Sequence, residues 1–172
     1  FSEVEKTFNF AKNINHRIIL LQCTSIYPAK PITINLNVIK TFRDKFADTV
    51  IGYSGHDSGI SIPIAAYSLG ARVIEKHFTL DRTQKGTDHQ FSLTPELLEE
   101  LVAELENVKL SLGDGNKKLL SEEKLARFKM GVEGAGLAIP VEALFRFAGK
   151  MESDLQPYSD QRSQGDVRSP PR

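Results

Sequence analysis

The chain has 172 residues, 40% hydrophobic and 26% charged, and its 22 basic and 22 acidic side chains give a formal net charge of zero. Zero net charge disfavours nucleic-acid binding through phosphate neutralisation, and no apolar run approaches the roughly 18 residues of a membrane span. The chain has one cysteine, and its first residues match neither a signal nor a transit peptide, so we expect a soluble, cytoplasmic protein without disulfides.

The first part of the chain predicts two helices around a strand. Apolar residues at helical spacing predict a helix over 4–14. The continuous apolar run 18–21, which continues through 22–24, is typical of a strand buried on both faces of a parallel sheet. Two prolines indicate a loop at 25–31. Asn35 is positioned to cap a second helix, whose apolar residues extend to 46.

Two further strands follow. Residues 50–54 predict the second strand, and it ends in the polar loop 55–59. A helix over 60–69 then stops at a glycine, which is a common residue after a helix. Residues 71–78 predict the third strand, and a loop over 81–93 is rich in charge, glycine and threonine.

The clearest helix of the chain begins at Thr94. Threonine is a favoured cap, proline is favoured at the first helical position, and an apolar stripe continues to Leu112. Residues 116–130 are charged and are predicted to be helical in part. The element order is therefore one helix followed by three strand–helix units.

This order predicts an α/β fold. Strands that begin roughly 20 to 30 residues apart, with helices between them, form either an open doubly wound sheet or part of a (β/α)8 barrel. In both architectures, ligands bind at the carboxyl ends of the strands. Those ends carry Ser25, Tyr27, Ser54, His56 and His77.

His56 and His77 form the sharpest candidate pair, because each follows a strand and the two strands are consecutive. Two converging imidazoles could ligate a divalent metal, with water, substrate or other residues completing the coordination. The alternative is that each histidine is an isolated polar loop residue.

The other candidates also have two interpretations. The hydroxyls of Ser25 and Ser54 could bind phosphate or sugar oxygens, or they could satisfy local backbone groups. Tyr27 could contact a ligand or cover the rim of the sheet. Asp88, next to a flexible glycine segment, is a candidate for binding sugar hydroxyls. Most of the loop around it is expected to be solvated.

Two residues are expected to have structural roles. Glu75 shares a strand face with His77, and a buried carboxylate there needs a partner, for which a structural ion pair is the favoured interpretation. Cys23 follows apolar neighbours, so we expect a small buried filler rather than a nucleophile.

Four stretches, in this order and spacing, resemble the N-acetylneuraminate synthase (sialic acid synthase) family over roughly residues 1–130. They are LLQCTSIYP at 20–28, IGYSGH at 51–56, ARVIEKHFTLD at 71–81, and KGTDHQFSL at 85–93. The resemblance implies a (β/α)8 barrel followed by a small antifreeze-like domain. It also implies condensation of phosphoenolpyruvate with N-acetylmannosamine, or its 6-phosphate, to give sialic acid or its 9-phosphate.

The resemblance also implies roles for individual residues. His56 and His77 match the metal-binding, catalytic histidines, and the metal is Mn²⁺ or Mg²⁺, a Lewis acid that polarises the sugar aldehyde. Glu75 has a supporting role. Substrate contacts are implied for Ser25, Tyr27, Ser54 and Asp88.

The match to the family is partial. We expect residues 1–112 to form the last three βα units of the barrel, because the first five strands have no counterpart, and 113–130 to form the linker. Residues 131–151 match nothing in the family, and 152–172 have a composition typical of a disordered tail. The family homodimer places the antifreeze-like domain of one subunit over the barrel mouth of the other, so the missing domain removes the basis for expecting that dimer here.

Three strands cannot close a barrel, so we expect the chain alone to be inactive. We expect both ends of the sequence to be interrupted, and a truncated gene model, a missed splice site or a frame shift would each produce such a tail. Two alternatives remain open: a non-catalytic truncated product that associates with a full-length synthase, and a small βα binding module unrelated to the synthases.

Overall fold

The computed structural model describes residues 1–130, in two compact units. The first unit is Phe1–Asn116, and the second begins at Lys117. The predictions for 131–151 and 152–172 lie outside the described residues. No helix within 1–130 combines the length and hydrophobicity needed to cross a membrane.

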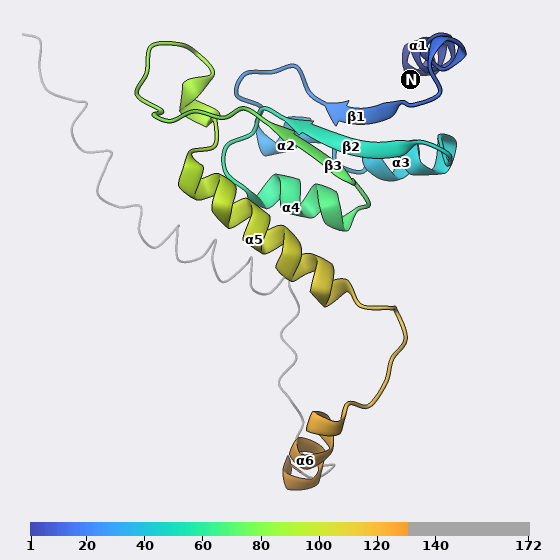
Figure 1. Cartoon of the computed structure of the whole chain (residues 1–172), viewed down its shortest axis with the longest axis vertical. Helices are drawn as coiled ribbons and strands as arrows, with labels where there is room; N and C mark the ends of the chain where they lie inside the picture. Colours follow the sequence, from blue (N-terminus) through green and yellow to red (C-terminus); the bar gives the residue numbers. More distant parts are fainter. Residues whose placement is uncertain (131–172) are drawn as a thin grey trace, which may run out of the picture. The chain divides into compact units, whose positions relative to one another are not determined.

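The first unit contains a parallel three-stranded sheet, as the sequence predicts. Its strands are β1 (Ile19–Cys23), β2 (Val50–Gly55) and β3 (Val73–Lys76), in the order β1-β2-β3 (Figure 1). The third strand is shorter than predicted, because the chain beyond Lys76 makes only an isolated bridge between Phe78 and Leu93.

Five α-helices belong to this unit, and four of them follow the predicted pattern. These four are α1 (Ser2–Ile14), α3 (Val38–Lys45), α4 (Ser61–Ser68) and α5 (Pro95–Leu112). The capping role predicted for Asn35 is wrong. A short helix, α2 (Pro31–Ile34), ends there with Asn35 in the left-handed conformation at φ 51°, and the cap position of α3 is Asn37.

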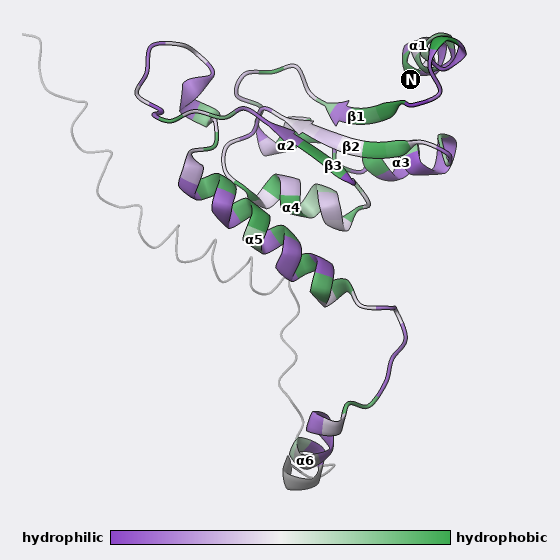
Figure 2. Cartoon of the chain, viewed as in Figure 1, coloured by the Kyte–Doolittle hydropathy of each residue, from purple (hydrophilic) through white to green (hydrophobic). Residues whose placement is uncertain are grey.

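One face of the sheet packs against α3 and α4, and α5 packs against α4 (Figure 1). The core between these layers consists of apolar side chains that alternate along the strands or line the helices, among them Ile39, Phe42, Ile51, Tyr53 and Ala66. Figure 2 shows hydrophobic and hydrophilic residues alternating along α5, as expected of an amphipathic helix.

The alternate strand residues point to the opposite face of the sheet, where apolar side chains meet solvent. Ile19 is 52% exposed and Val50 is 47% exposed. Cys23 is exposed as well, so its predicted role as a buried filler is wrong. Gly52 lies on this same face of the sheet. A Cβ at this position would lie 2.4 Å from a carbon of the Leu21 side chain, so the packing on this face requires glycine.

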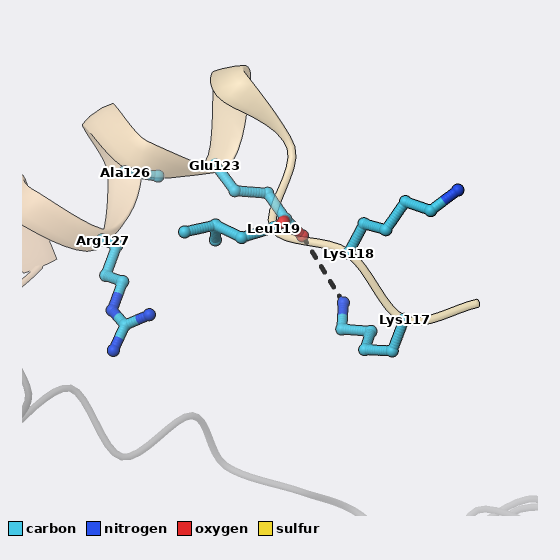
Figure 3. Close-up of a pocket in the computed structure, with 6 residues that line it drawn as sticks. All are labelled: Lys117, Lys118, Leu119, Glu123, Ala126 and Arg127. Carbon is cyan, nitrogen blue, oxygen red and sulfur yellow. Dashed lines mark ion pairs between the residues drawn. The ribbon is translucent and has the colours of Figure 1, made fainter.

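The second unit contains α6 (Ser121–Met130), in agreement with the prediction of partial helix over 116–130. Glu123 accepts a hydrogen bond from the Leu120 backbone N–H at 2.8 Å and lies 3.8 Å from Lys117 Nζ. Figure 3 shows this ion pair among the residues that line a pocket of the second unit. It contains none of the predicted site residues.

Candidate functional site

Three rings from three consecutive βα units converge at the carboxyl end of the sheet. Tyr27 follows β1, His56 follows β2 and His77 follows β3. The ring centroids lie 4.0 Å apart for Tyr27 and His56, and 5.3 Å apart for the two histidines. The parallel register brings the strand ends together, so residues 50 positions apart in sequence become neighbours.

The orientation of His56 is set by the backbone of the neighbouring unit. Its Nδ1 lies 2.8 Å from the carbonyl oxygen of Thr24. A carbonyl only accepts, so the neutral imidazole carries its hydrogen on Nδ1, and Nε2 keeps a free lone pair. The backbone carbonyl of His56 in turn accepts the Ala29 N–H at 3.0 Å, which ties together the loops after β1 and β2.

His77 is held by the loop after β3. Its backbone carbonyl accepts the Leu93 N–H at 2.8 Å. A 3-10 helix, η1 (His89–Phe91), closes this loop and places the Phe91 ring 5.2 Å from the His77 ring. Asp88, immediately before η1, puts Oδ2 3.7 Å from His77 Nδ1. This separation is too long for a hydrogen bond but short enough for charge attraction when the imidazole is protonated.

Ser54 and Glu75 lie one layer below the rings. They are register partners on β2 and β3, and the Ser54 hydroxyl donates to Glu75 Oε1 at 2.7 Å. Within residues 1–130 the structure thus gives Glu75 a hydroxyl partner. The ion pair with an unseen lysine or arginine stays a prediction. Ser54 is buried and Glu75 is exposed on the face without helices.

Four of the six predicted site residues gather in one place: Tyr27, His56, His77 and Asp88. Ser54 lies on β2, two residues before His56. Ser25 lies in the exposed loop after β1, and no hydrogen bond in the described part of the chain connects it to the other five.

The histidine pair has the donor chemistry that a divalent metal needs. Nδ1 of His56 is hydrogen-bonded to a carbonyl oxygen, the arrangement that orients a ligating imidazole and leaves Nε2 for the metal. Nδ1 of His77 lies 3.7 Å from the Asp88 carboxylate, which attracts the imidazole without a hydrogen bond. In residues 1–130, no group of three or more His, Cys, Asp or Glu side chains could hold a metal. The pair therefore fits as two ligands, and the remaining positions would be left to water or substrate.

Sequence reasoning missed a polar cluster directly behind His56. The Tyr53 hydroxyl donates to Asp57 Oδ1 at 2.5 Å, and Lys76 Nζ lies 3.2 Å from Asp57 Oδ2. The charged side chains are only 3% and 4% exposed. One signal was available: Lys76 alternates with Glu75 and His77, which puts a lysine on the helix-covered face, where it needs a partner.

The environment of this cluster changes the proton affinities of two of its groups. Burial raises the pKa of the Tyr53 hydroxyl, and the hydrogen bond to Asp57 and its charge raise that pKa further. Burial lowers the pKa of Lys76, and the attraction of Asp57 partly offsets that change.

Comparisons with known proteins agree with the geometry. A model of the NeuB family matches residues 1–117. The N-acetylneuraminate-9-phosphate synthase of Homo sapiens is 44% identical over 128 residues, which are 74% of this chain and 36% of the human protein. The N,N'-diacetyllegionaminic acid synthase of Campylobacter jejuni is 43% identical over 125 residues, 71% of this chain and 37% of the relative.

Solved structures give the same result. The sialic acid synthetase of Leptospira borgpetersenii, solved in complex with citrate, superposes with a TM-score of 0.65 at 37% identity, over 78% of this chain and 47% of that one. The chain spans about a third of the length of the curated relatives it matches. With the family match covering most of its residues and a parallel sheet that carries the expected histidine pair, the chain belongs to the NeuB family.

Proposed function

We propose that this chain carries part of the active site of a sialic acid synthase-type enzyme, which condenses phosphoenolpyruvate with N-acetylmannosamine or its 6-phosphate. The observation that supports this most is the convergence of His56, His77 and Tyr27 at the carboxyl ends of three parallel strands, in a chain of the NeuB family. Carbon 3 of phosphoenolpyruvate attacks the sugar aldehyde, water adds at carbon 2, and phosphate leaves with cleavage of the carbon–oxygen bond.

Each residue at the site has a role in this proposal. Nε2 of His56 and of His77 would hold Mn²⁺ or Mg²⁺, which when bound supplies Lewis-acid polarisation of the aldehyde oxygen. Tyr27, 52% exposed, and the half-exposed Asp88 are accessible for orienting the amino sugar. The Ser54 hydroxyl donates to Glu75, so contact with the anionic phosphoenolpyruvate requires it to rotate away from that carboxylate. Ser25, in the exposed loop after β1, is proposed to contact the substrate.

The bare sheet face supports the proposal of a partial barrel. In a closed (β/α)8 barrel, one face of each strand meets helices and the other lines a packed interior. Here Ile19, Val50 and Cys23 lie on a face that meets solvent. We therefore propose that 1–112 are the last three βα units of such a barrel, that 113–130 are the linker, and that the 172-residue chain alone does not turn over substrate.

A chimera tests the proposed activity. Residues 1–117 replace the matching segment of the human relative, and product formation from phosphoenolpyruvate and N-acetylmannosamine 6-phosphate is assayed with Mn²⁺. We expect the chimera to be active and His56→Ala to abolish its activity. His16→Ala, which changes an exposed histidine between α1 and β1, is the matched control and should retain activity. A folded chimera without product, or an active His56→Ala chimera, contradicts the proposal.

A second candidate function rests on the same exposed face. A truncated chain with an uncovered sheet could associate with a full-length synthase without catalysing the reaction. A pull-down with the human synthase tests this, and turnover by the 172-residue chain alone contradicts both the inactive fragment and this alternative. Family membership contradicts the third hypothesis, a βα module unrelated to the synthases.

A further inference from the structure

The Tyr53–Asp57–Lys76 cluster is the feature of the fold that the proposed chemistry does not use. Asp57 is held at three points. Its Oδ1 accepts from the Tyr53 hydroxyl at 2.5 Å, its Oδ2 lies 3.2 Å from Lys76 Nζ, and its backbone carbonyl accepts a hydrogen bond from the same ammonium group. Both the side chain and the backbone of the residue after His56 are therefore fixed.

The loop is shaped to accommodate this cluster. A Cβ on Gly55 would lie 2.4 Å from Asp57 Oδ1 and 2.5 Å from the Tyr53 ring. Only glycine leaves room for the carboxylate to fold back onto the tyrosine hydroxyl. The turn from β2 into the polar loop thus depends on the cluster on one side of the backbone, while His56 projects from it toward Thr24 and Tyr27.

Stability alone is a weak reason for such an arrangement. Removing two charges from water is costly, and replacing a buried ion pair by apolar residues of similar volume is often neutral or stabilising. The sequence positions suggest another reason. Asp57 directly follows His56 and Lys76 directly precedes His77, so the ion pair joins the backbone beside one histidine to the backbone beside the other.

We propose that Tyr53, Asp57 and Lys76 are positioning residues for the histidine pair. By fixing the turn after His56, they hold its Nδ1 against the Thr24 carbonyl and present Nε2, and by bridging β2 and β3 they set the separation of the two imidazoles. The link to metal binding rests on the proposed function. The positioning of the His56 ring by the cluster does not depend on the proposed function, because it is argued from contacts within the metal-free protein.

The test uses the full 172-residue chain and Tyr53→Phe, which keeps the ring in the core and removes only the hydroxyl. In the metal-free protein, imidazole nitrogen shifts from long-range proton–nitrogen correlation spectra report which ring nitrogen of His56 carries the hydrogen. We expect the Nδ1–H tautomer alone in the unmodified chain and a mixture of both tautomers in Tyr53→Phe.

Mn²⁺ titration by calorimetry gives the second readout. Changes to the groups that orient metal ligands typically weaken metal affinity by about 10- to 100-fold, and we expect a loss in this range for Tyr53→Phe. Ile39→Val is the control, because it removes one methyl group from the same buried core, at a residue of α3. It should change neither the His56 tautomer nor the Mn²⁺ affinity.

The outcomes separate the inference from the proposed function. If the unmodified chain does not bind Mn²⁺, the metal site of the proposed function fails, and the tautomer comparison still decides the positioning role. A folded Tyr53→Phe chain with an unchanged His56 tautomer overturns the inference. Should Tyr53→Phe not fold, Lys76→Arg, which keeps the charge and alters the geometry of donation, is measured instead, and an unchanged tautomer there overturns the inference equally.

Discussion

Two ion pairs in this chain have nearly the same length and very different surroundings. Lys76 and Asp57 are 3.2 Å apart, with side chains 4% and 3% exposed, whereas Lys45 and Glu5 are 3.3 Å apart, with side chains 51% and 44% exposed. The matched substitutions are Asp57→Asn and Glu5→Gln. Each removes one negative charge and keeps the shape of the side chain, so any difference between them reports the effect of burial.

The magnitudes follow from the cost of an uncompensated charge. Asp57→Asn leaves the Lys76 ammonium buried without its counter-ion, and breaking a buried pair in this way costs about 3–5 kcal/mol. Glu5→Gln leaves Lys45 in water, where such pairs contribute about 0–1 kcal/mol. The double variant Asp57→Asn with Lys76→Met removes both charges. It should lose less free energy of unfolding than the two single variants together, by about 0.5–3 kcal/mol.

The assay is urea denaturation at pH 7, followed by far-UV circular dichroism, with the free energy of unfolding extrapolated to water. We expect a large decrease in midpoint for Asp57→Asn and almost none for Glu5→Gln. Equal losses for the two variants, or strict additivity in the double variant, would refute the reasoning that burial determines the effect of this pair.

Three further predictions concern stability. The raised pKa of Tyr53 means that the folded state keeps a proton which the unfolded state loses near pH 10. The contribution of Tyr53 to the free energy of unfolding is therefore fully present below pH 10 and is lost as the pH rises above it. The pKa of Lys76 is lowered, so its contribution to the free energy of unfolding increases with pH and stops increasing near pH 10.5. Above that pH, denaturant titrations should show a loss of about 1.4 kcal/mol per pH unit that Tyr53→Phe abolishes. Gly55→Ala should lower the free energy of unfolding by about 1–3 kcal/mol through overpacking against Asp57, measured by urea titration. Thr94 accepts the Leu97 N–H at the start of α5, so Thr94→Ala should cost about 0.5–1 kcal/mol in a thermal melt, and an unchanged melting temperature contradicts the cap.

Much of the site could be predicted because it depends on local patterns. Apolar runs mark β1, β2 and β3, and parallel strands bring their carboxyl ends to one edge, so the residues that follow the strands meet there. The positions of His56 and His77 follow from this rule alone. Their ring separation and the tautomer of His56 do not, because both depend on contacts between separate βα units.

The errors also have physical causes. A four-residue helix such as α2 has no periodicity to detect, so the sequence pattern places Asn35 at the start of the next helix rather than at the end of this one. An apolar run predicts a strand that is covered on both faces, which would bury Cys23, but in the described residues helices cover only one face of the sheet and Cys23 is exposed. The contact between Asp57 and Lys76 spans 19 positions and requires the register of β2 and β3, which the pattern of one strand does not contain.

The hydrogen bond from Ala29 to His56 has a consequence for measurement. The loop after β1 is largely exposed, so most of its amide hydrogens should exchange quickly with solvent. Ala29 is buried, and its N–H is donated to the His56 carbonyl. Its exchange with deuterium therefore requires the two loops to separate, and its protection factor measures the free energy of opening the histidine site. One amide can thus serve as a reporter of site assembly in any variant, without substrate or metal.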